Sequence, residues 1–149
     1  MRLPRVFTAA ALAAALTVAC SDSTAPTEVT LADLVGEWDA ASAVFTPVAG
    51  GTGVDVVALG FAFNIVINAE GGYVATLTDP IEGDEIELGT LAVANGVITF
   101  TPTGEDPYTM DIVNLDGNTL TVRDDDESFD FDDDDVEEDA ILTIVLEKV

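Results

Sequence analysis

The residues best suited to chemistry are carboxylates, concentrated near the C-terminus in the stretch FDFDDDDVEEDA, residues 129–140. This stretch contains the Asp-x-Asp-x-Asp spacing of a calcium loop with an acid at its ninth place, so the candidate metal ligands are Asp130, Asp132, Asp134 and Glu138. Such oxygens suit Ca²⁺, which binds hard oxygen ligands in flexible geometry. The glycine and the bidentate glutamate of a complete loop are missing, since Asp135 and Ile141 hold their places. Two interpretations remain open, a calcium site and a solvated charge run, and we favour the second.

Catalytic chemistry has few other residues to use. The chain has no histidine and one cysteine, and it contains no glycine-rich phosphate-binding loop. Its remaining acids lie in turns or at strand positions that we expect to face water, as for Asp39, Glu87 and Asp111. We therefore expect a protein that is not an enzyme.

The first 19 residues have the pattern of a secretory signal peptide. Arg2 and Arg5 form a basic start, and the apolar run that follows is too short to cross a bilayer comfortably. The sequence LTVAC, which ends at Cys20, resembles the lipobox of bacterial lipoproteins, in which cleavage precedes a cysteine that becomes diacylated. This resemblance implies a lipid-anchored protein of the bacterial cell envelope, and Ser21 favours the outer membrane, facing the periplasm or the cell surface. The alternative is an ordinary signal peptide followed by a free thiol, a liability in an exported protein.

The charge of the chain argues against nucleic acid as a partner. The formal net charge is −25, and removal of Arg2 and Arg5 with the signal peptide would make it −27. Phosphates and anionic lipid headgroups repel such a chain, so its membrane attachment would depend on the acyl chains. Residues 20–29 are small and polar and include a proline, which is typical of a flexible tether, and residues 30–149 are long enough for one domain.

Alternation of apolar and polar residues predicts about eight strands, near residues 37–46, 55–68, 72–79, 86–94, 97–102, 107–114, 119–131 and 140–148. Short connections such as Asn95-Gly96 predict antiparallel hairpins between successive strands. A run of hairpins with one apolar face closes on itself to remove exposed edges, so we predict an all-β, antiparallel up-and-down barrel. Thr30 and Asp33 predict a capping box at one short helical turn before the first strand.

The predicted interior face is bulky and aromatic. It comprises Trp38, Phe61, Phe63, Ile65, Tyr73, Leu77, Ile98, Phe100, Tyr108, Met110, Ile112, Leu142, Ile144 and Leu146. An eight-stranded barrel is wide enough to be filled by its own side chains or to hold one small ligand. Side chains of this size favour a filled interior.

The phase of the alternation changes within the predicted strand 119–131. Leu120 and Val122 are at even positions, whereas Phe129 and Phe131 are at odd positions. A regular strand cannot turn both pairs to the same face, so we predict a β-bulge within residues 124–127. The acidic residues then form a hairpin tip at about 132–139.

The stretch LVGEWDAASAVF resembles the first strand of lipocalin-like domains, in which a Gly-x-Trp pair closes one end of the barrel beneath a short helical turn; here the pair is Gly36 and Trp38. The run from residue 31 to residue 149 is similar to small bacterial lipocalin-like lipoproteins. In that family a late basic residue stacks on the tryptophan, and Lys148 is the candidate.

The resemblance implies a barrel that binds a small apolar ligand, with Trp38, Phe61, Phe63 and Tyr108 as candidate ligand-binding residues. The alternative function is a structural or interaction module whose acidic tip meets cations, Ca²⁺ among them, or a basic partner. The residues do not identify a protein partner.

Overall fold

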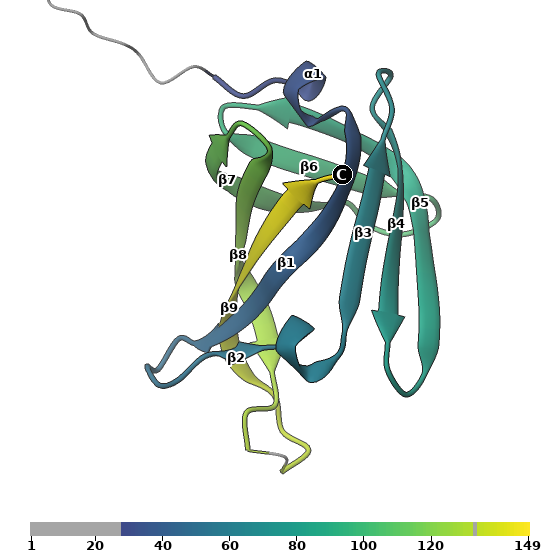
Figure 1. Ribbon diagram of the computed structural model, residues 1–149. Coiled ribbons are helices and arrows are strands. Elements are labelled where there is room, and N and C mark those ends of the chain that lie inside the picture. Colours follow the sequence, from purple (N-terminus) through teal and green to yellow (C-terminus); the bar gives the residue numbers. More distant parts are fainter. Residues whose placement is uncertain (1–27, 133) are drawn as a thin grey trace, which may run out of the picture.

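The computed structural model describes residues 28–132 and 134–149, in which the strands wrap around a common axis (Figure 1). The elements, in chain order, are α1 (Leu31–Leu34), β1 (Gly36–Pro47), β2 (Val54–Asp55), the 3₁₀ turn η1 (Val57–Leu59), β3 (Ala62–Ile67), β4 (Gly72–Asp79), β5 (Gly83–Ala94), β6 (Val97–Pro102), β7 (Tyr108–Asp116), β8 (Thr119–Phe129) and β9 (Glu138–Lys148). The predicted signal peptide, Cys20 and residues 21–27 of the predicted tether lie outside the described residues. Within the described ranges, no helix is long and apolar enough to cross a membrane.

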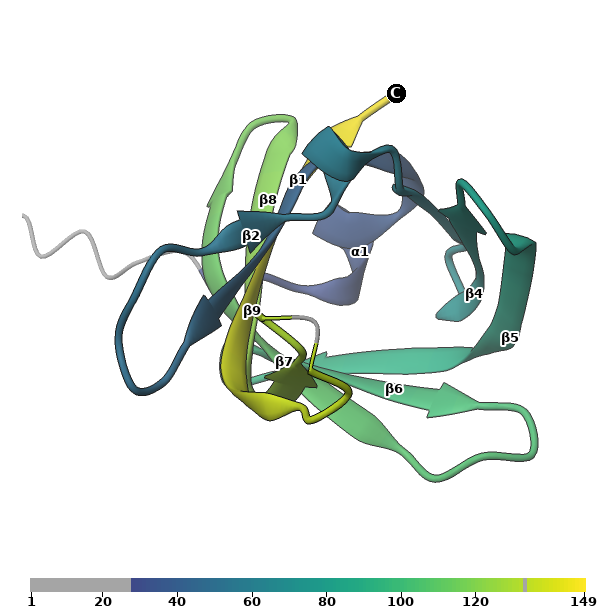
Figure 2. The ribbon, with the colours of Figure 1, turned by 90° about the horizontal axis from the view of Figure 1, so that it is seen from below.

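The sheet is a closed antiparallel barrel, as predicted. From β3 to β9 each strand pairs with the next one in sequence, and β1 pairs with both β3 and β9, which closes the circle. Figure 2 shows this closure from the lower end. Of the nine strands, β2 has two residues and pairs only with the far part of β1, so the other eight form the barrel.

The predicted strand at 55–68 is wrong in its first half. The chain instead forms β2 and η1 before β3 begins at residue 62. The carboxylate of Asp55 accepts the backbone N–H groups of Ala43 and Val57, each at 3.1 Å, and Gly60 adopts a left-handed conformation with φ +104°. These features turn the chain and end the extended segment, because a left-handed residue cannot continue a strand.

The predicted bulge in β8 is confirmed. Asp124 pairs with Leu142 and Glu127 with Ala140, so β8 advances three residues while β9 advances two. The extra residue restores the phase and turns Phe129 inward, where its ring stacks on Phe45 with 4.7 Å between centroids. β8 ends at Phe129, two residues earlier than predicted.

The predicted helical turn forms at one end of the barrel. The backbone N–H and the hydroxyl of Thr30 donate hydrogen bonds to Asp33 Oδ2, at 2.8 and 2.7 Å. These two bonds lower the pKa of the Asp33 carboxyl group. They fix the start of α1 and so position Leu34 over the barrel end.

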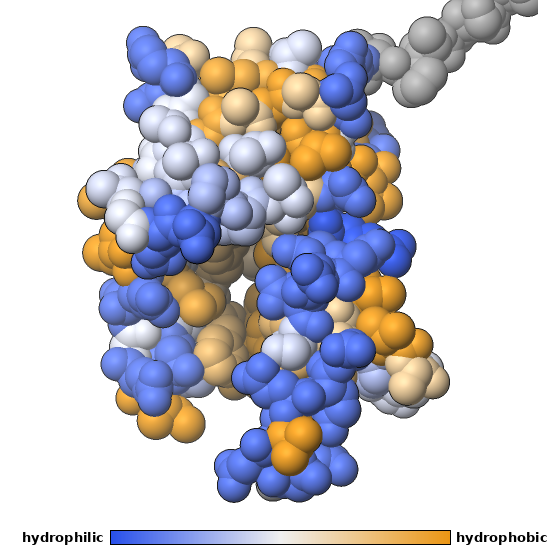
Figure 3. Space-filling model, turned by 180° about the vertical axis from the view of Figure 1, so that it is seen from behind, coloured by the Kyte–Doolittle hydropathy of each residue, from blue (hydrophilic) through white to orange (hydrophobic). Residues whose placement is uncertain are grey.

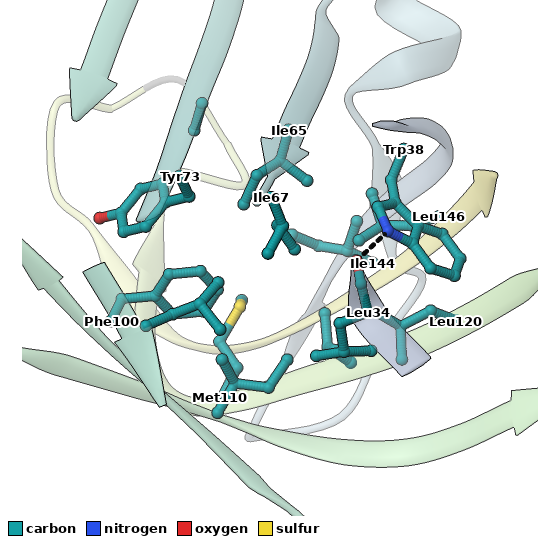
Figure 4. Packing of buried hydrophobic residues seen from close by; sticks show 14 of the residues in the cluster. Leu34, Trp38, Ile65, Ile67, Tyr73, Phe100, Met110, Leu120, Ile144 and Leu146 are labelled. Atoms are coloured by element: carbon teal, nitrogen blue, oxygen red, sulfur yellow. Dashed lines mark hydrogen bonds between the residues drawn. The ribbon is translucent and has the colours of Figure 1, made fainter. Parts of the chain in front are cut away.

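Trp38 closes the same end beneath α1. Its side chain is completely buried, and its Nε1–H donates to the backbone oxygen of Leu34 at 2.8 Å (Figure 4). Lys148 Nζ lies 5.0 Å from the centre of the Trp38 ring, where the charge attracts the ring face. Gly36, with φ +137°, lets Lys148 approach, because a Cβ at this position would lie 2.7 Å from Lys148 Cε.

Candidate binding cavity

The interior of the barrel contains a cavity of about 420 Å³. Every barrel strand except β5 contributes to its apolar wall, which is formed by Trp38, Ala43, Phe45, Val56, Phe61, Phe63, Ile65, Ile67, Leu77, Ile98, Phe100, Tyr108, Met110, Leu120, Val122, Phe129, Leu142, Ile144 and Leu146. This volume is within the range of small-molecule sites. The expectation that side chains fill the interior is therefore wrong. The bulky residues are present as predicted, but they leave a space of this volume between them.

All four predicted ligand-binding residues line this cavity. Trp38 lies at its closed end, and Phe61 and Phe63 lie on the wall formed by β3 and the segment that precedes it. Tyr108 is 38% exposed. The structure therefore brings these residues to one space, and their role in binding remains a prediction.

The strand pairing leaves one side of the barrel open. Residues 83–87 of β5 pair only with β4, because the β5–β6 ladder begins at Gly89. Residues 124–129 of β8 pair only with β9, because the β7–β8 ladder stops at Arg123. Figure 3 shows the molecule hollowed between the β4–β5 and β8–β9 hairpins, with apolar residues around the hollow. A ligand thus has a lateral route to the cavity.

Glu87 faces this interior, which corrects the prediction that it faces water. It pairs with Ala75 across the sheet, and cross-strand partners share a face. Its Oε1 atom accepts hydrogen bonds from the hydroxyls of Tyr73, at 2.5 Å, and of Tyr108, at 3.0 Å. The apolar neighbours Ile86 and Leu88 point outward instead and are 62% and 54% exposed.

The rings of Tyr73 and Tyr108 both pack against Phe100 in the apolar wall. The Tyr108 ring stacks on Phe100 at 4.9 Å between centroids, and Tyr73 meets the edge of the same ring at 5.3 Å. Burial raises the pKa of both phenols above the usual value, and the neighbouring Glu87 carboxylate raises it further. Both hydroxyls therefore stay protonated and donate to Glu87. Gly89 is the residue in the sequence that could have indicated this arrangement. It lies opposite Tyr73 in the neighbouring strand and leaves room for the tyrosine ring.

The acidic hairpin tip connects β8 and β9 at the end of the barrel opposite α1. Carboxylate oxygens of Asp130, Asp132 and Asp134 all lie within 4.8 Å of one another, a spacing that could hold a metal ion. Asp130 also accepts backbone N–H groups of the tip, including that of Asp135 at 3.0 Å. The fourth predicted ligand, Glu138, is outside this group, and its Oε2 atom accepts the N–H of Phe131 at 3.0 Å.

Comparison with known proteins shows a likeness among solved structures. No family model matches the chain, and no curated protein matches it. Among solved structures, the chain is similar to a lipocalin-like protein from Bacteroides uniformis, with 13% sequence identity and a TM-score of 0.49. The match covers 78% of this chain and 99% of that one. The assignment to a closed, eight-stranded antiparallel barrel rests on the strand pairing of this chain itself.

Proposed function

We propose that this protein binds a small, largely apolar molecule inside its barrel and does not convert it. The observation that carries the proposal is the apolar cavity of about 420 Å³ with a lateral opening. Its walls are aliphatic and aromatic side chains with one thioether, that of Met110, and they hold a ligand by contact and do not attack it. Burial of apolar ligand surface at ~25 cal/mol per Å² supplies the favourable free energy.

We also propose that the protein is a lipoprotein of the bacterial envelope, acylated at Cys20. The signal-peptide pattern of residues 1–19 and the lipobox-like LTVAC support this. The segment that leads into α1 lies at the end of the barrel opposite the tip of the β8–β9 hairpin (Figure 1). A tether at that end would place the acidic tip on the side of the barrel away from the membrane.

Native mass spectrometry of the mature protein, purified from membranes, tests both proposals. A bound ligand adds a reproducible mass of roughly a few hundred daltons that disappears on denaturation, as expected for a molecule that fits a pocket of this size. Acylation adds a mass that persists on denaturation and is absent from the Cys20→Ala variant. An unmodified thiol at Cys20 would contradict the anchor but leave the binding proposal standing.

A second candidate function is an interaction module with a calcium-binding tip. The convergence of oxygens from Asp130, Asp132 and Asp134 within 4.8 Å favours it. Clustered carboxylates repel one another, so a cation among them would stabilise the hairpin. This function does not exclude binding in the barrel, because the two sites use different residues.

A further inference from the structure

We infer that the ligand is an amphipathic cation, an apolar body carrying a protonated amine, with the amine held at Glu87. This inference rests on the proposed binding in the barrel and specifies the chemical class of the ligand. It follows from three properties of the recess around Glu87: its position beside the cavity, its hydrogen-bonding groups and its charge.

The recess adjoins the main cavity. It has a volume of about 210 Å³ and is lined by Phe63, Ala75, Leu77, Glu85, Glu87 and Tyr108. Three of these residues, Phe63, Leu77 and Tyr108, also line the main cavity, so the two spaces share a wall. A ligand whose apolar part occupies the main cavity can therefore extend a polar end to Glu87.

The polar groups of the recess accept hydrogen bonds and have no free proton to donate. A carboxylate is an acceptor, and Glu87 Oε1 already receives the hydroxyl protons of Tyr73 and Tyr108. The two phenol oxygens keep lone pairs after donating those protons. Among the described residues, no hydrogen bond to Glu87 Oε2 is formed, so this oxygen is available to a ligand. The polar end of the ligand must therefore be a donor, and an ammonium group supplies three N–H bonds.

The charge of the recess selects a cation. Glu85 lies beside Glu87 in the same wall, and both carboxylates sit against apolar surface that strengthens their field. The two basic side chains of the described residues are elsewhere: Arg123 is paired with Asp125, and Lys148 lies over Trp38 at the closed end. An anionic headgroup would thus meet two carboxylates and no counter-charge, whereas an amine would form a charge-assisted hydrogen bond with Glu87.

Three probes with the same chain and different headgroups test this inference: dodecylammonium, dodecanol and dodecanoate. Each is titrated below its aggregation concentration, at physiological salt to screen the acidic surface. The reporter is the fluorescence of Trp38, the only tryptophan in the chain, which lines the cavity. We expect one dodecylammonium per protein, bound about tenfold more tightly than dodecanol, since a hydrogen bond to a charged group contributes about that factor. Dodecanoate should bind most weakly.

Three variants test whether the preference for dodecylammonium arises from the recess around Glu87. Glu87→Gln keeps an acceptor for both tyrosines, so it should weaken dodecylammonium binding about tenfold and dodecanol binding by much less, because the hydroxyl of dodecanol carries no charge. Glu85→Gln, at an exposed position, should act in the same direction by about twofold. Asp111→Asn removes the same charge from the outer face of β7 and should change neither affinity.

The outcomes separate this inference from the function on which it rests. Equal binding of all three probes, or a cation preference that both Glu87→Gln and Glu85→Gln leave intact, would overturn the amphipathic cation and leave apolar binding in place. If Glu87→Gln fails to fold, Glu85→Gln and the ranking of the wild-type probes still decide the matter. Failure of dodecanol and dodecylammonium alike to bind would contradict the proposed function as well.

Discussion

The hydroxyl of Tyr108, at the start of β7, donates a hydrogen bond to Oε1 of Glu87 on β5 at 3.0 Å. These two strands are not neighbours in the sheet, because β6 lies between them. The bond therefore spans the place where the β5–β6 ladder has ended and links the rim of the opening to the aromatic wall. Tyr73, from β4, converges on the same carboxylate oxygen.

This convergence predicts different stability effects for the two tyrosines. Tyr73 is 3% exposed and Tyr108 is 38% exposed, so loss of the Tyr73 hydroxyl removes a more deeply buried bond to a charged group. We expect Tyr73→Phe to lower the free energy of unfolding by about 1.5–3 kcal/mol and Tyr108→Phe by less than about 1 kcal/mol. Urea unfolding measures both. Equal losses would mean that Glu87 does not hold Tyr73 in the way described.

The raised pKa values of Tyr73 and Tyr108 predict a loss of stability in alkali. Burial, reinforced by Glu87, holds both phenols protonated in the folded state, while the unfolded chain ionises them near their ordinary value of about 10. The stabilisation is therefore complete below pH ~10 and declines as the pH rises above it. Melting temperatures from pH 8 to pH 12 should fall less steeply in Tyr73→Phe than in the wild type. Parallel curves would contradict the assignment.

Glu127, beside the bulge in β8, predicts a stabilising substitution. Burial raises the pKa of its carboxyl group, and the nearby charge of Asp124 raises it further, so the folded protein disfavours the ionised form. We expect Glu127→Gln to raise the melting temperature at neutral pH, and the gain to vanish as the pH falls below the pKa of the unfolded chain, because the wild type is then protonated too. The matched control is Glu147→Gln, at an exposed position in β9. An equal gain in the control would show a general effect of net charge.

The comparison between β8 and β5 shows what sequence reasoning could and could not predict. Both strands change the phase of their apolar residues. In β8 the change is absorbed by a bulge, as predicted, which turns Phe129 inward. In β5 the ladders continue without a register shift, so Leu91 is buried while Ile86 and Leu88 remain outside and Glu87 turns inward. The alternation of residues in the sequence shows that the apolar face changes within a strand. Whether a bulge corrects this change depends on the register with the neighbouring strands, which the sequence does not show.

Two other predictions were confirmed, one from local chemistry and one from the family resemblance. The capping residues Thr30 and Asp33 are three apart in the chain, and their side-chain contact needs no tertiary information. The position of Lys148 over Trp38 followed from the resemblance to lipocalin-like domains. The resemblance implied a ligand-binding barrel, but the pattern of residues alone could not predict the cavity, since the distance between opposite walls depends on where each ladder ends.

The acidic tip predicts a modest response to calcium if Asp130, Asp132 and Asp134 bind it. Extracellular calcium sites bind at ~10⁻⁴–10⁻³ M, so about 1 mM calcium should stabilise the fold by ~0.4–1.4 kcal/mol. Thermal melts with calcium and with chelator measure this difference, and the double variant Asp132→Asn, Asp134→Asn should abolish it. If the melts with calcium and with chelator coincide, the tip is a solvated run of charges and not a calcium site. Asp111→Asn controls for the loss of charge outside the tip.

The most direct test of binding in the barrel is the titration of Trp38 fluorescence with dodecanol in three proteins. Ala43 lines the cavity and Ala92 is exposed on the outer face of β5, so Ala43→Phe fills the binding space while Ala92→Phe adds the same side chain outside it. We predict saturable one-site binding to the wild type and to Ala92→Phe, and a loss of at least about tenfold in affinity for Ala43→Phe. No saturable binding to the wild type, or equal affinity of all three folded proteins, would contradict a ligand site inside the barrel.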